Sequence, residues 1–489
     1  MLESNEPHPN GPQPETADAQ LQSSDVESAM HSVEAAKATP NPYDGPDDKR
    51  NPRNWSGFMK FLHVLVPCVL SFEITIATSS TSPATGIIAK EFGLTRTVSI
   101  LTLTLYTLGL AFGPVIIAPF SEIWGRKPIY IATSSFLLIF IGGASASQNY
   151  ATLLVCRFLA GALGSAGVAT GAGTIADCFD LVRDPAGSIS SVLFILGPFL
   201  GPTLGPLAGA YILSAHGNNW RWTQYLVLFI GAPVWVGCVL MKETSRKWIL
   251  RKETGDRVTG AKIVSLAANA IMRPTKMLFT EVVVLSMAVY SAFAYAMIFS
   301  YFTSASYVLQ TLYGFNSKEV GLSFISVIIG YIFATIIFIG LDRVSRVLAA
   351  KKSPPRPACT RGAPLVCIGW KRLLAQWLVL VRMGSSPRWT LGISCGGWNF
   401  HWSWILHHLL SFYGPATAAS AIAANGILRY ILGAVFPLFT IQMFQNLGVH
   451  WAASLFAFVA LGLLLIPWLL YKYGPVLRSR SKFNQTASK

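Results

Sequence analysis

Charged residues are scarce in this chain. Asp, Glu, Lys and Arg make up 12% of its 489 residues, whereas soluble domains contain about 25%. Carboxylates are the rarest group: beyond residue 52 there are twelve, against thirty-five Lys and Arg, which gives that part a net charge of +23. Hydrophobic residues reach 52%, with a mean hydropathy of +0.48. This composition excludes an ordinary soluble domain and indicates a protein whose main solvent is lipid.

The sequence also lacks paired cysteines and the usual signatures of catalysis. Its seven cysteines contain no Cys-x-x-Cys pair and no spacing with histidine that suits a metal ion. No nucleophile, metal cluster or phosphate-binding loop has a recognisable spacing. The basic residues interrupt long apolar runs and do not alternate with aromatics on a compact domain, which argues against nucleic-acid binding. We therefore expect no enzyme, no cofactor, no metal and no nucleic-acid partner.

Residues 1–52 differ from the rest of the chain. They hold ten acids and three bases, a net charge of −7, and no apolar run. Such a segment cannot bury enough surface to order itself, and it lacks the basic and apolar regions of a cleaved signal. We expect a disordered cytosolic tail.

The remainder contains apolar runs long enough to cross a bilayer, whose core of about 30 Å needs roughly 20 helical residues. The candidate spans are residues 60–82, 98–119, 128–147, 151–176, 188–213, 220–241, 279–303, 318–341, 415–440 and 450–471, with two irregular spans, the ninth and tenth, within 364–410. The prediction is an all-α membrane protein with twelve spans. Two six-helix bundles, residues 53–241 and 279–471, are joined by a middle loop, 242–278, and followed by a tail, 472–489. Lys and Arg crowd before the first span, in the middle loop and in this tail, which places both termini and the middle loop in the cytosol.

A short polar segment separates the second and third spans, with the sequence GPVIIAPFSEIWGRKP at residues 113–128. The apolar helix is expected to end at Pro119, and Gly125 allows the chain to reverse. Glu122 is expected at the positive N-terminus of the next helix. The string resembles the loop-two signature of the major facilitator superfamily, in which an inter-helix charge relay helps to close the cytosolic gate. By this resemblance the gating residues are Gly113, Glu122, Gly125, Arg126 and Lys127.

Arg157 interrupts the apolar, glycine-rich fourth span. An arginine within the bilayer is costly unless it faces a cavity or a partner. Its surroundings resemble the Arg-x-x-x-Gly motif of proton-driven drug antiporters, in which the arginine is linked to proton transfer. The alternative is an arginine whose side chain reaches the outer interface.

The fifth span carries small residues at four-residue steps, which permit close contact between helices. Its Gly197, Gly201, Pro202 and Gly205 resemble the antiporter signature that exporters carry and that uptake members of the superfamily generally lack. The resemblance therefore favours efflux, although Pro206 replaces the second of the two glycines that usually close the signature. Packing between helices is the alternative explanation.

Other strings extend the resemblance to the fungal drug:proton antiporter family with twelve spans, and within it to the polyamine and multidrug exporter branch. They are NPRNWS (51–56), WRWTQY (220–225), KETSRKWILRK (242–252) and SAIAANGILRYILGAVFPLFTIQMFQNLGVHW (420–451). The resemblance implies inverted three-helix repeats and alternating access, with export of drugs, polyamines or a fungal secondary metabolite in exchange for protons. We expect a monomer whose partners are small molecules, protons and the lipid bilayer, and the lack of obvious retention signals leaves the plasma membrane as the default location. A proton-coupled uptake carrier and a non-transporting or inactive relative are the alternatives.

Glu73 is the only carboxylate deep within a predicted span. At about 1.5 Å per residue it lies roughly 20 Å from the cytosolic end of the first span, and Arg157 lies roughly 9 Å from the outer end of the fourth. These depths nearly coincide, and the resemblance implies that spans one and four both line the central cavity, so we expect the two side chains to approach each other and Glu73 to carry the coupled proton. The alternative is a polar cavity residue that contacts cargo or water.

Aromatic side chains of the seventh span form a second candidate site. They are Tyr290, Phe293, Tyr295 and Phe299. Aromatic faces of this kind bind cations, so we expect them to line the substrate cavity and to stack on a cationic cargo. Packing between helices is again the alternative.

The pattern breaks at residues 353–408. Lys371 and Arg372 interrupt the expected ninth span, and the apolar run that follows is too short to cross. The resemblance resumes abruptly at SFYGPATAAS, residues 411–420. We therefore expect a shifted reading frame or wrong exon junctions within this anomalous segment.

Overall fold

The structure is a computed structural model that describes most of the chain. The described residues are 45, 48–179, 184–255, 260–351, 415–463, 465–466, 469–470 and 472–473. The chain divides into two units, Met1–Trp55 and Ser56–Lys489. The anomalous segment 353–408 lies outside the described residues, and so do nearly all of the predicted tails, 1–52 and 472–489.

In the described part of the first unit, residues Pro52–Asn54 form a 3-10 helix, η2. The side chain of Asn51 caps it by accepting a hydrogen bond from the backbone N–H of Arg53 at 3.0 Å. Arg50 and Asp48 form an exposed ion pair at 2.6 Å, and the hydrogen bonds from Arg50 hold the pKa of Asp48 below its ordinary value.

In the second unit the described residues form helices and no strand. The first half contains α2 (Gly57–Ser79), η3 (Ser82–Ala84), α3 (Thr85–Glu91), α4 (Arg96–Trp124), α5 (Arg126–Ser145), α6 (Tyr150–Gly164), α7 (Ala166–Cys178), α8 (Pro185–Ala215) and α9 (Trp222–Leu240). The rest contains α10 (Arg246–Thr254), α11 (Gly260–Thr280), α12 (Val282–Tyr313), α13 (Ser317–Ser323), α14 (Ile325–Lys351) and α17 (Pro415–Leu463). Seven helical stretches among these residues are long and apolar enough to cross a membrane. The predicted all-α membrane fold is confirmed.

The predicted end of the second span at Pro119 is wrong. The helix α4 continues through this proline to Trp124. A proline inside a helix removes one backbone hydrogen bond, but Ser121 and Ile123 beyond it are buried, and their packing keeps the last turn helical. The chain then reverses at Gly125, whose φ of 93° belongs to the region that favours glycine, as the sequence predicts.

Two predicted spans are each divided into two helices. In the fourth span, α6 and α7 meet at Ser165, whose hydroxyl donates to the carbonyl of Ala162 at 3.1 Å. Such a side-chain bond to the preceding turn competes with the regular helical bond and often bends the helix. In the eighth span, α13 and α14 meet at Phe324, and Asn316 and Glu319 form a capping box that starts α13.

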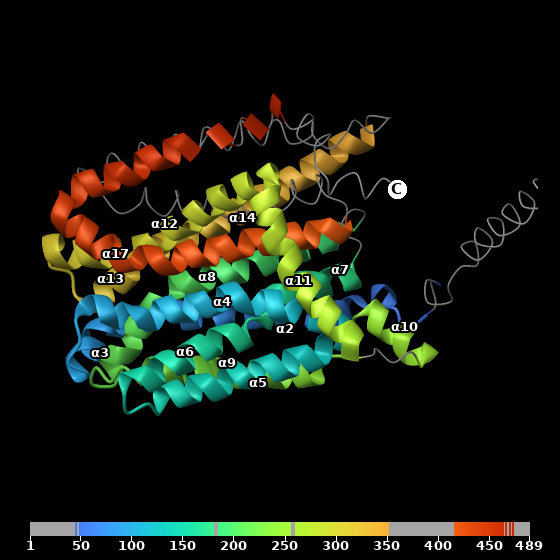
Figure 1. The fold of residues 1–489 in the computed structure, drawn as a ribbon, viewed down its shortest axis with the longest axis horizontal. Coiled ribbons are helices and arrows are strands. Elements are labelled where there is room, and N and C mark those ends of the chain that lie inside the picture. Colours follow the sequence, from blue (N-terminus) through green and yellow to red (C-terminus); the bar gives the residue numbers. More distant parts are fainter. Residues whose placement is uncertain are drawn as a thin grey trace, which may run out of the picture. The chain divides into compact units, whose positions relative to one another are not determined.

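The two halves of the second unit meet along α4 and α8. The helix α4 packs against α17, and α8 packs against α13 and α14; Figure 1 shows α4 and α17 side by side. Within the first half, α2 packs against α7, α8 and α9, and α5 packs against α6 and α9. The helices α3 and α13 lie at one end of this arrangement and α10 at the other (Figure 1).

A buried aromatic and aliphatic cluster crosses from one half to the other. It includes Tyr106 of α4, Phe199 of α8, Tyr295 of α12, Tyr331 of α14 and Tyr430 of α17. The rings of Phe199 and Tyr331 contact each other edge to face, with their centroids 5.8 Å apart. Because lipid is as apolar as these side chains, their shape complementarity holds the halves together more than exclusion from water does.

Candidate functional site

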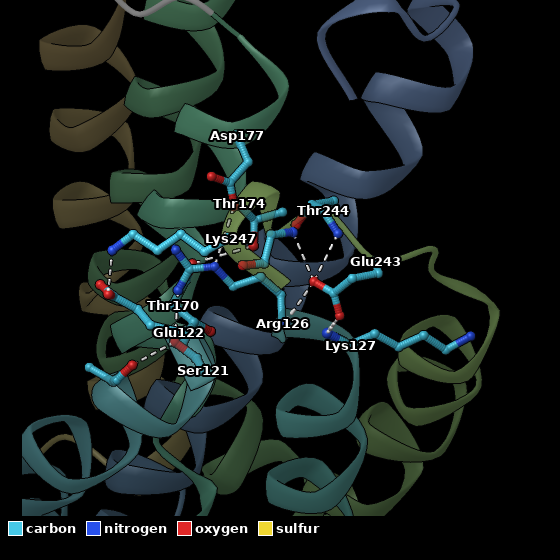
Figure 2. A network of polar contacts seen from close by, with 12 residues as sticks. Ser121, Glu122, Arg126, Lys127, Thr170, Thr174, Asp177, Glu243, Thr244 and Lys247 are labelled. Carbon is cyan, nitrogen blue, oxygen red and sulfur yellow. Dashed lines mark hydrogen bonds and ion pairs between the residues drawn. The ribbon is translucent and has the colours of Figure 1, made fainter. Parts of the chain in front are cut away.

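The turn between α4 and α5 is closed by Glu243, which follows α9 in the sequence (Figure 2). The Glu243 carboxylate accepts hydrogen bonds from four backbone N–H groups, those of Arg126 (2.8 Å), Lys127 (3.1 Å), Thr244 (3.0 Å) and Ser245 (2.8 Å). The first N–H groups of a helix have no partner within the helix and carry partial positive charge, so a carboxylate stabilises them. A Cβ atom at Gly125 would lie 2.8 Å from the carboxyl carbon of Glu243, so glycine leaves room for this cap without displacing the side chain.

The expectation that Glu122 occupies the N-terminus of the third span is therefore wrong. Glu122 points away from that terminus and pairs with Lys247 of α10 at 2.7 Å, with both side chains exposed (Figure 2). Arg251 of α10 also donates to the carbonyl of Ile123 at 3.2 Å. Glu122 precedes Gly125, at which the chain reverses, so its carboxylate remains on the α10 side. These two contacts attach the start of the middle loop to the end of α4.

The guanidinium of Arg126 joins the ends of three spans. It donates to the Ser121 hydroxyl at 2.7 Å and pairs with Asp177 of α7 at 3.4 Å. A Cβ atom at Gly173 would lie 2.5 Å from Nη2 of Arg126, so the glycine of α7 provides the space that this side chain fills. The Lys127 side chain extends away from these groups (Figure 2). Of the expected charged residues Glu122, Arg126 and Lys127, Arg126 is the one whose side chain pairs with α7 among the described residues, and its acidic partner there is Asp177.

The fifth predicted gating residue, Gly113, lies within α4, three turns before the loop. A Cβ atom there would overlap Ala162 and Ser165, where α6 meets α7. Gly109 and Gly161 make similar close approaches between α4 and α6. The structure thus places Gly113 in a helix-packing seam and not at the charged turn.

The small residues of α8 pack against α2. Added Cβ atoms at Gly201 and Gly205 would lie 2.6 Å from the backbone nitrogen of Ile76 and 2.9 Å from that of Ser80. Gly197 similarly approaches the carbonyl of Cys68, while Pro202 is buried beside Gly201. The stripe therefore brings two helices of the first half into direct backbone contact.

Arg157 of α6 is fully buried and bound at the C-terminal end of α2 and to the residues that follow it. Its Nη1 donates to the carbonyl of Ala77 and its Nη2 to the hydroxyl of Thr81, both at 2.7 Å. The guanidinium carbon lies 5.5 Å from the centre of the Tyr106 ring, and the Tyr106 hydroxyl donates to the carbonyl of Ile74 at 2.8 Å. The side chain does not extend to the surface, so the alternative of an arginine at the outer interface is wrong. Arg157 joins α6 and α2, with α4 closing the contact.

Glu73 is also buried on α2, with a relative exposure of 1%. Its carboxyl group faces α9, where a Cβ atom added at Gly231 would overlap it. Neither carboxyl oxygen has a hydrogen-bond partner among the described residues, and Arg157 binds α2 one and two turns further along. We expect Glu73 and Arg157 to approach each other, but in this conformation the two side chains do not form an ion pair.

The four aromatics of α12 contact different surroundings. Tyr290 packs with Ala421 and Ala424 of α17, and Phe293 contacts Phe436 of α17 edge to face at 6.3 Å. Tyr295 and Phe299 belong to the cluster that joins the two halves. The structure therefore divides the four predicted aromatics into two pairs. Tyr290 and Phe293 pack against α17, whereas Tyr295 and Phe299 lie in the cluster between the two halves.

Arg429 of α17 is a candidate site residue that the sequence criteria do not select. Its guanidinium carbon lies 5.1 Å from the ring centre of Tyr295 and 4.6 Å from that of Tyr430, and the side chain is buried at 9% exposure. A base within an apolar run is the same signal that singles out Arg157, and it was available at Arg429. No such signal identifies Glu243 or Asp177, because acids that follow a span are ordinary loop residues in the sequence.

Three polar or cation–π contacts join the two halves toward the end that carries α3 and α13. Gln442 of α17 donates to the hydroxyl of Thr97 in α4 at 2.8 Å. About two turns deeper along both helices, the Thr104 hydroxyl donates to the carbonyl of Ala434 at 3.0 Å. Lys318 of α13 lies over the ring of Tyr211 in α8 at 5.9 Å. These contacts are at the opposite end from the charged turn of Figure 2.

Comparisons with known proteins agree with this architecture. A model of the Major Facilitator Superfamily matches residues 68–437. Efflux pump radE of Floropilus chiversii is 34% identical over 478 residues, covering 90% of this chain and 85% of that protein. Polyamine transporter 4 of Saccharomyces cerevisiae is 30% identical over 492 residues, covering 91% and 73%. Efflux pump FUBT of Fusarium oxysporum is 32% identical over 471 residues, covering 91% and 77%.

Solved structures share the fold at low sequence identity. The proton:xylose symporter XylE, bound to 6-bromo-6-deoxy-D-glucose, has a TM-score of 0.60 at 14% identity, covering 86% of this chain and 96% of that one. The human organic anion transporter MFSD10 has a TM-score of 0.56 at 15% identity, covering 88% and 100%. At these identities the likeness concerns the arrangement of helices alone.

Proposed function

The chain belongs to the Major Facilitator Superfamily and transports small molecules across a membrane, and we propose that it exports organic compounds in exchange for protons. It is a multi-pass membrane transporter and not an enzyme. The proposed bundles are residues 53–241 and 279–471, linked by the cytosolic loop 242–278. Both termini are proposed to be cytosolic, and the protein is proposed to act as a monomer in the plasma membrane.

One observation carries the proton coupling. The helix α2 holds a buried carboxyl group, Glu73, and binds a buried guanidinium, Arg157, one and two turns away. Ionisable side chains at membrane depth are costly and mark ion or substrate pathways. Arg157 Nε has no hydrogen-bond partner among the described residues, so it retains a donor for a charged Glu73 in a conformation that brings the two side chains together. Glu73 is proposed to have two states. In one it is protonated, and in the other it is charged and paired with Arg157. Binding of the proton determines which state is populated.

The contacts between halves support alternating access. In this conformation Thr97–Gln442 and Thr104–Ala434 join α4 and α17 toward the α3 and α13 end. That end is proposed to be extracellular, because the positive loops lie at the other. The arrangement then corresponds to a state closed to the outside. Opening to the outside requires these contacts to separate while the turn around Arg126 closes the cytosolic side.

The cargo is proposed to lie near Tyr295, Phe299 and Arg429, between the halves. Relatives called efflux pumps and a polyamine transporter favour drugs, polyamines or a secondary metabolite as cargo, and they favour export. The stripe of Gly201 and Gly205 is consistent with an exporter. A proton-coupled uptake carrier remains the second candidate because one structural neighbour is a symporter.

The direction of transport is tested by cargo retention in a drug-sensitive yeast. Cells that express the chain are compared with cells that carry an empty vector, using radiolabelled spermidine, an azole and a fluorescent dye, with and without a proton uncoupler. Lower retention that the uncoupler abolishes supports export driven by protons. Higher retention that the uncoupler abolishes supports uptake. Equal retention, with the protein visible at the cell surface, contradicts both and favours an inactive relative.

A further inference from the structure

Glu73 and Val66 lie two turns apart on the face of α2 that meets α9. Each faces a glycine of α9: an added Cβ atom at Gly237 would lie 3.2 Å from Val66, and one at Gly231 would overlap the carboxyl group of Glu73. Leu138 of α5 covers the same spot, since its Cδ2 lies 2.5 Å from the Gly231 Cβ position. Glu73 therefore lies in a small compartment between α2, α5 and α9.

The compartment offers this carboxyl group no compensation for a charge. Both oxygens are buried and have no hydrogen-bond partner among the described residues. An ionised carboxylate in such surroundings is far less favourable than the neutral acid, because no donor among the described residues replaces its hydration. A protonated Glu73 is the form that this packing accommodates.

Among the described residues, no charged side chain of the surrounding helices pairs with Glu73 in this conformation. The helix α9 contains no Asp, Glu, Lys, Arg or His. The other charged or titratable residues on elements around α2 are Lys60, His63 and Cys68 of α2 itself, Arg96, Tyr106 and Glu122 of α4, Arg126, Lys127 and Tyr130 of α5, Tyr150, Cys156 and Arg157 of α6, Asp177 and Cys178 of α7, Tyr211 of α8, and Tyr225 and Cys238 of α9. Of these, Tyr106 and Cys238 interact electrostatically with Glu73, and both are neutral groups under ordinary conditions. Arg157 is held by Ala77 and Thr81.

We propose that this conformation is the proton-loaded state, in which neutral Glu73 is enclosed between α2, α5 and α9 and Gly231 is the positioning residue that makes room for it. The opposite face of α9 is exposed at Phe229, Val236 and Leu240, so α9 is packed on one side only. Movement of α9 away from α2 opens the compartment and lets the proton leave. This inference rests on the proposed function for its role in transport, but the protonation of Glu73 is a separate, directly measurable property.

The direct test is infrared difference spectroscopy of the full chain in lipid nanodiscs. We expect a carboxylic acid C=O stretching band at neutral pH that is lost in Glu73→Gln. In Gly231→Ala the added methyl group displaces the carboxyl group, so the band shifts or is lost. Gly237→Ala on the same helix faces Val66 instead and leaves the band unchanged. Absence of a Glu73 band in the wild-type protein at neutral pH overturns the proposal, as does an equal effect of the two alanine substitutions.

Two further measurements distinguish failure of the proposal from misfolding of a variant and from failure of the proposed function. If Gly231→Ala is poorly folded, Gly231→Ala combined with Leu138→Ala supplies space for the methyl group, and a restored fold with a changed band supports the proposal. Counterflow of cargo in proteoliposomes is then measured across a pH series. A Glu73 band together with transport that ignores pH supports the proton-loaded compartment and contradicts proton coupling. Coupled transport without a Glu73 band contradicts the compartment alone.

Discussion

The carboxylate of Glu243 accepts a hydrogen bond from the backbone N–H of Arg126 at 2.8 Å, although 117 residues separate the two in the sequence. The contact joins the end of α9 to the start of α5. Three further backbone N–H groups donate to the same carboxylate. The Glu243 side chain therefore caps α5 and also fixes the backbone that leads into α10.

Replacement of Glu243 by Ala is expected to destabilise the end of the first half that carries the turn between α4 and α5. The change removes hydrogen bonds to a charged group, which contribute about 1.5–3 kcal/mol each, and leaves partly buried N–H groups unpaired. The matched control is Glu122→Ala, which breaks an exposed ion pair worth about 0–1 kcal/mol. Thermal unfolding in detergent, followed by size-exclusion recovery, checks the difference. Equal losses in both variants contradict the capping role.

Gly201→Ala is expected to lower stability and surface delivery by separating α8 from α2. The added Cβ would lie 2.6 Å from the backbone nitrogen of Ile76, and backbone cannot move aside as a side chain can. Overpacking of this kind costs about 1–3 kcal/mol. Gly142→Ala on α5 is the control, because nothing lies within 4 Å of its Cβ position. Fluorescence of a tagged chain at the cell surface reports the outcome.

Arg157→Lys is expected to abolish most transport while the protein still reaches the membrane. A lysine keeps the charge but cannot bind the Ala77 carbonyl and the Thr81 hydroxyl with one planar group. Thr81→Val removes a single acceptor, and a loss of about 1.5 kcal/mol corresponds to roughly tenfold slower transport. Initial rates of cargo efflux at matched expression distinguish the variants. Full activity in Arg157→Lys would show that the guanidinium geometry is irrelevant.

Tyr295→Leu is expected to impair cargo handling more than Tyr295→Phe. The guanidinium of Arg429 lies over the Tyr295 ring at 5.1 Å, and phenylalanine retains an aromatic face at this position whereas leucine does not. A cation–π contact contributes about 0.5–2 kcal/mol. Efflux measured over a range of cargo concentrations separates weaker binding from slower turnover. Identical behaviour of the two variants contradicts a role for the ring face.

Sequencing of the transcript is expected to show a different reading frame or different exon junctions across residues 353–408. The prediction rests on Lys371 and Arg372 within an expected span and on the abrupt return of the family pattern at residue 411. A mature message that encodes the same residues contradicts it. In that case transport by the chain as given becomes the decisive measurement for the inactive-relative alternative.

The local features of the sequence identified the class of protein and much of the fold. Composition and apolar run length identify membrane spans because helix rise and bilayer thickness are fixed. The reversal at Gly125 follows from glycine's access to positive φ, and the stripe of Gly197, Gly201 and Gly205 follows from four-residue spacing on one helix face.

Only the tertiary structure decided which groups meet. In an apolar span the lipid-facing and protein-facing sides are both hydrophobic, so periodicity does not reveal the rotation of the helix. For that reason the depth of Glu73 could be read from the sequence, but its direction toward Gly231 and not toward Arg157 could not. The same limit explains why the sequence predicts Glu122 at a helix terminus that Glu243 occupies. Capping of α5 depends on where α9 ends in space, and no local pattern encodes the distance between the end of α9 and the start of α5.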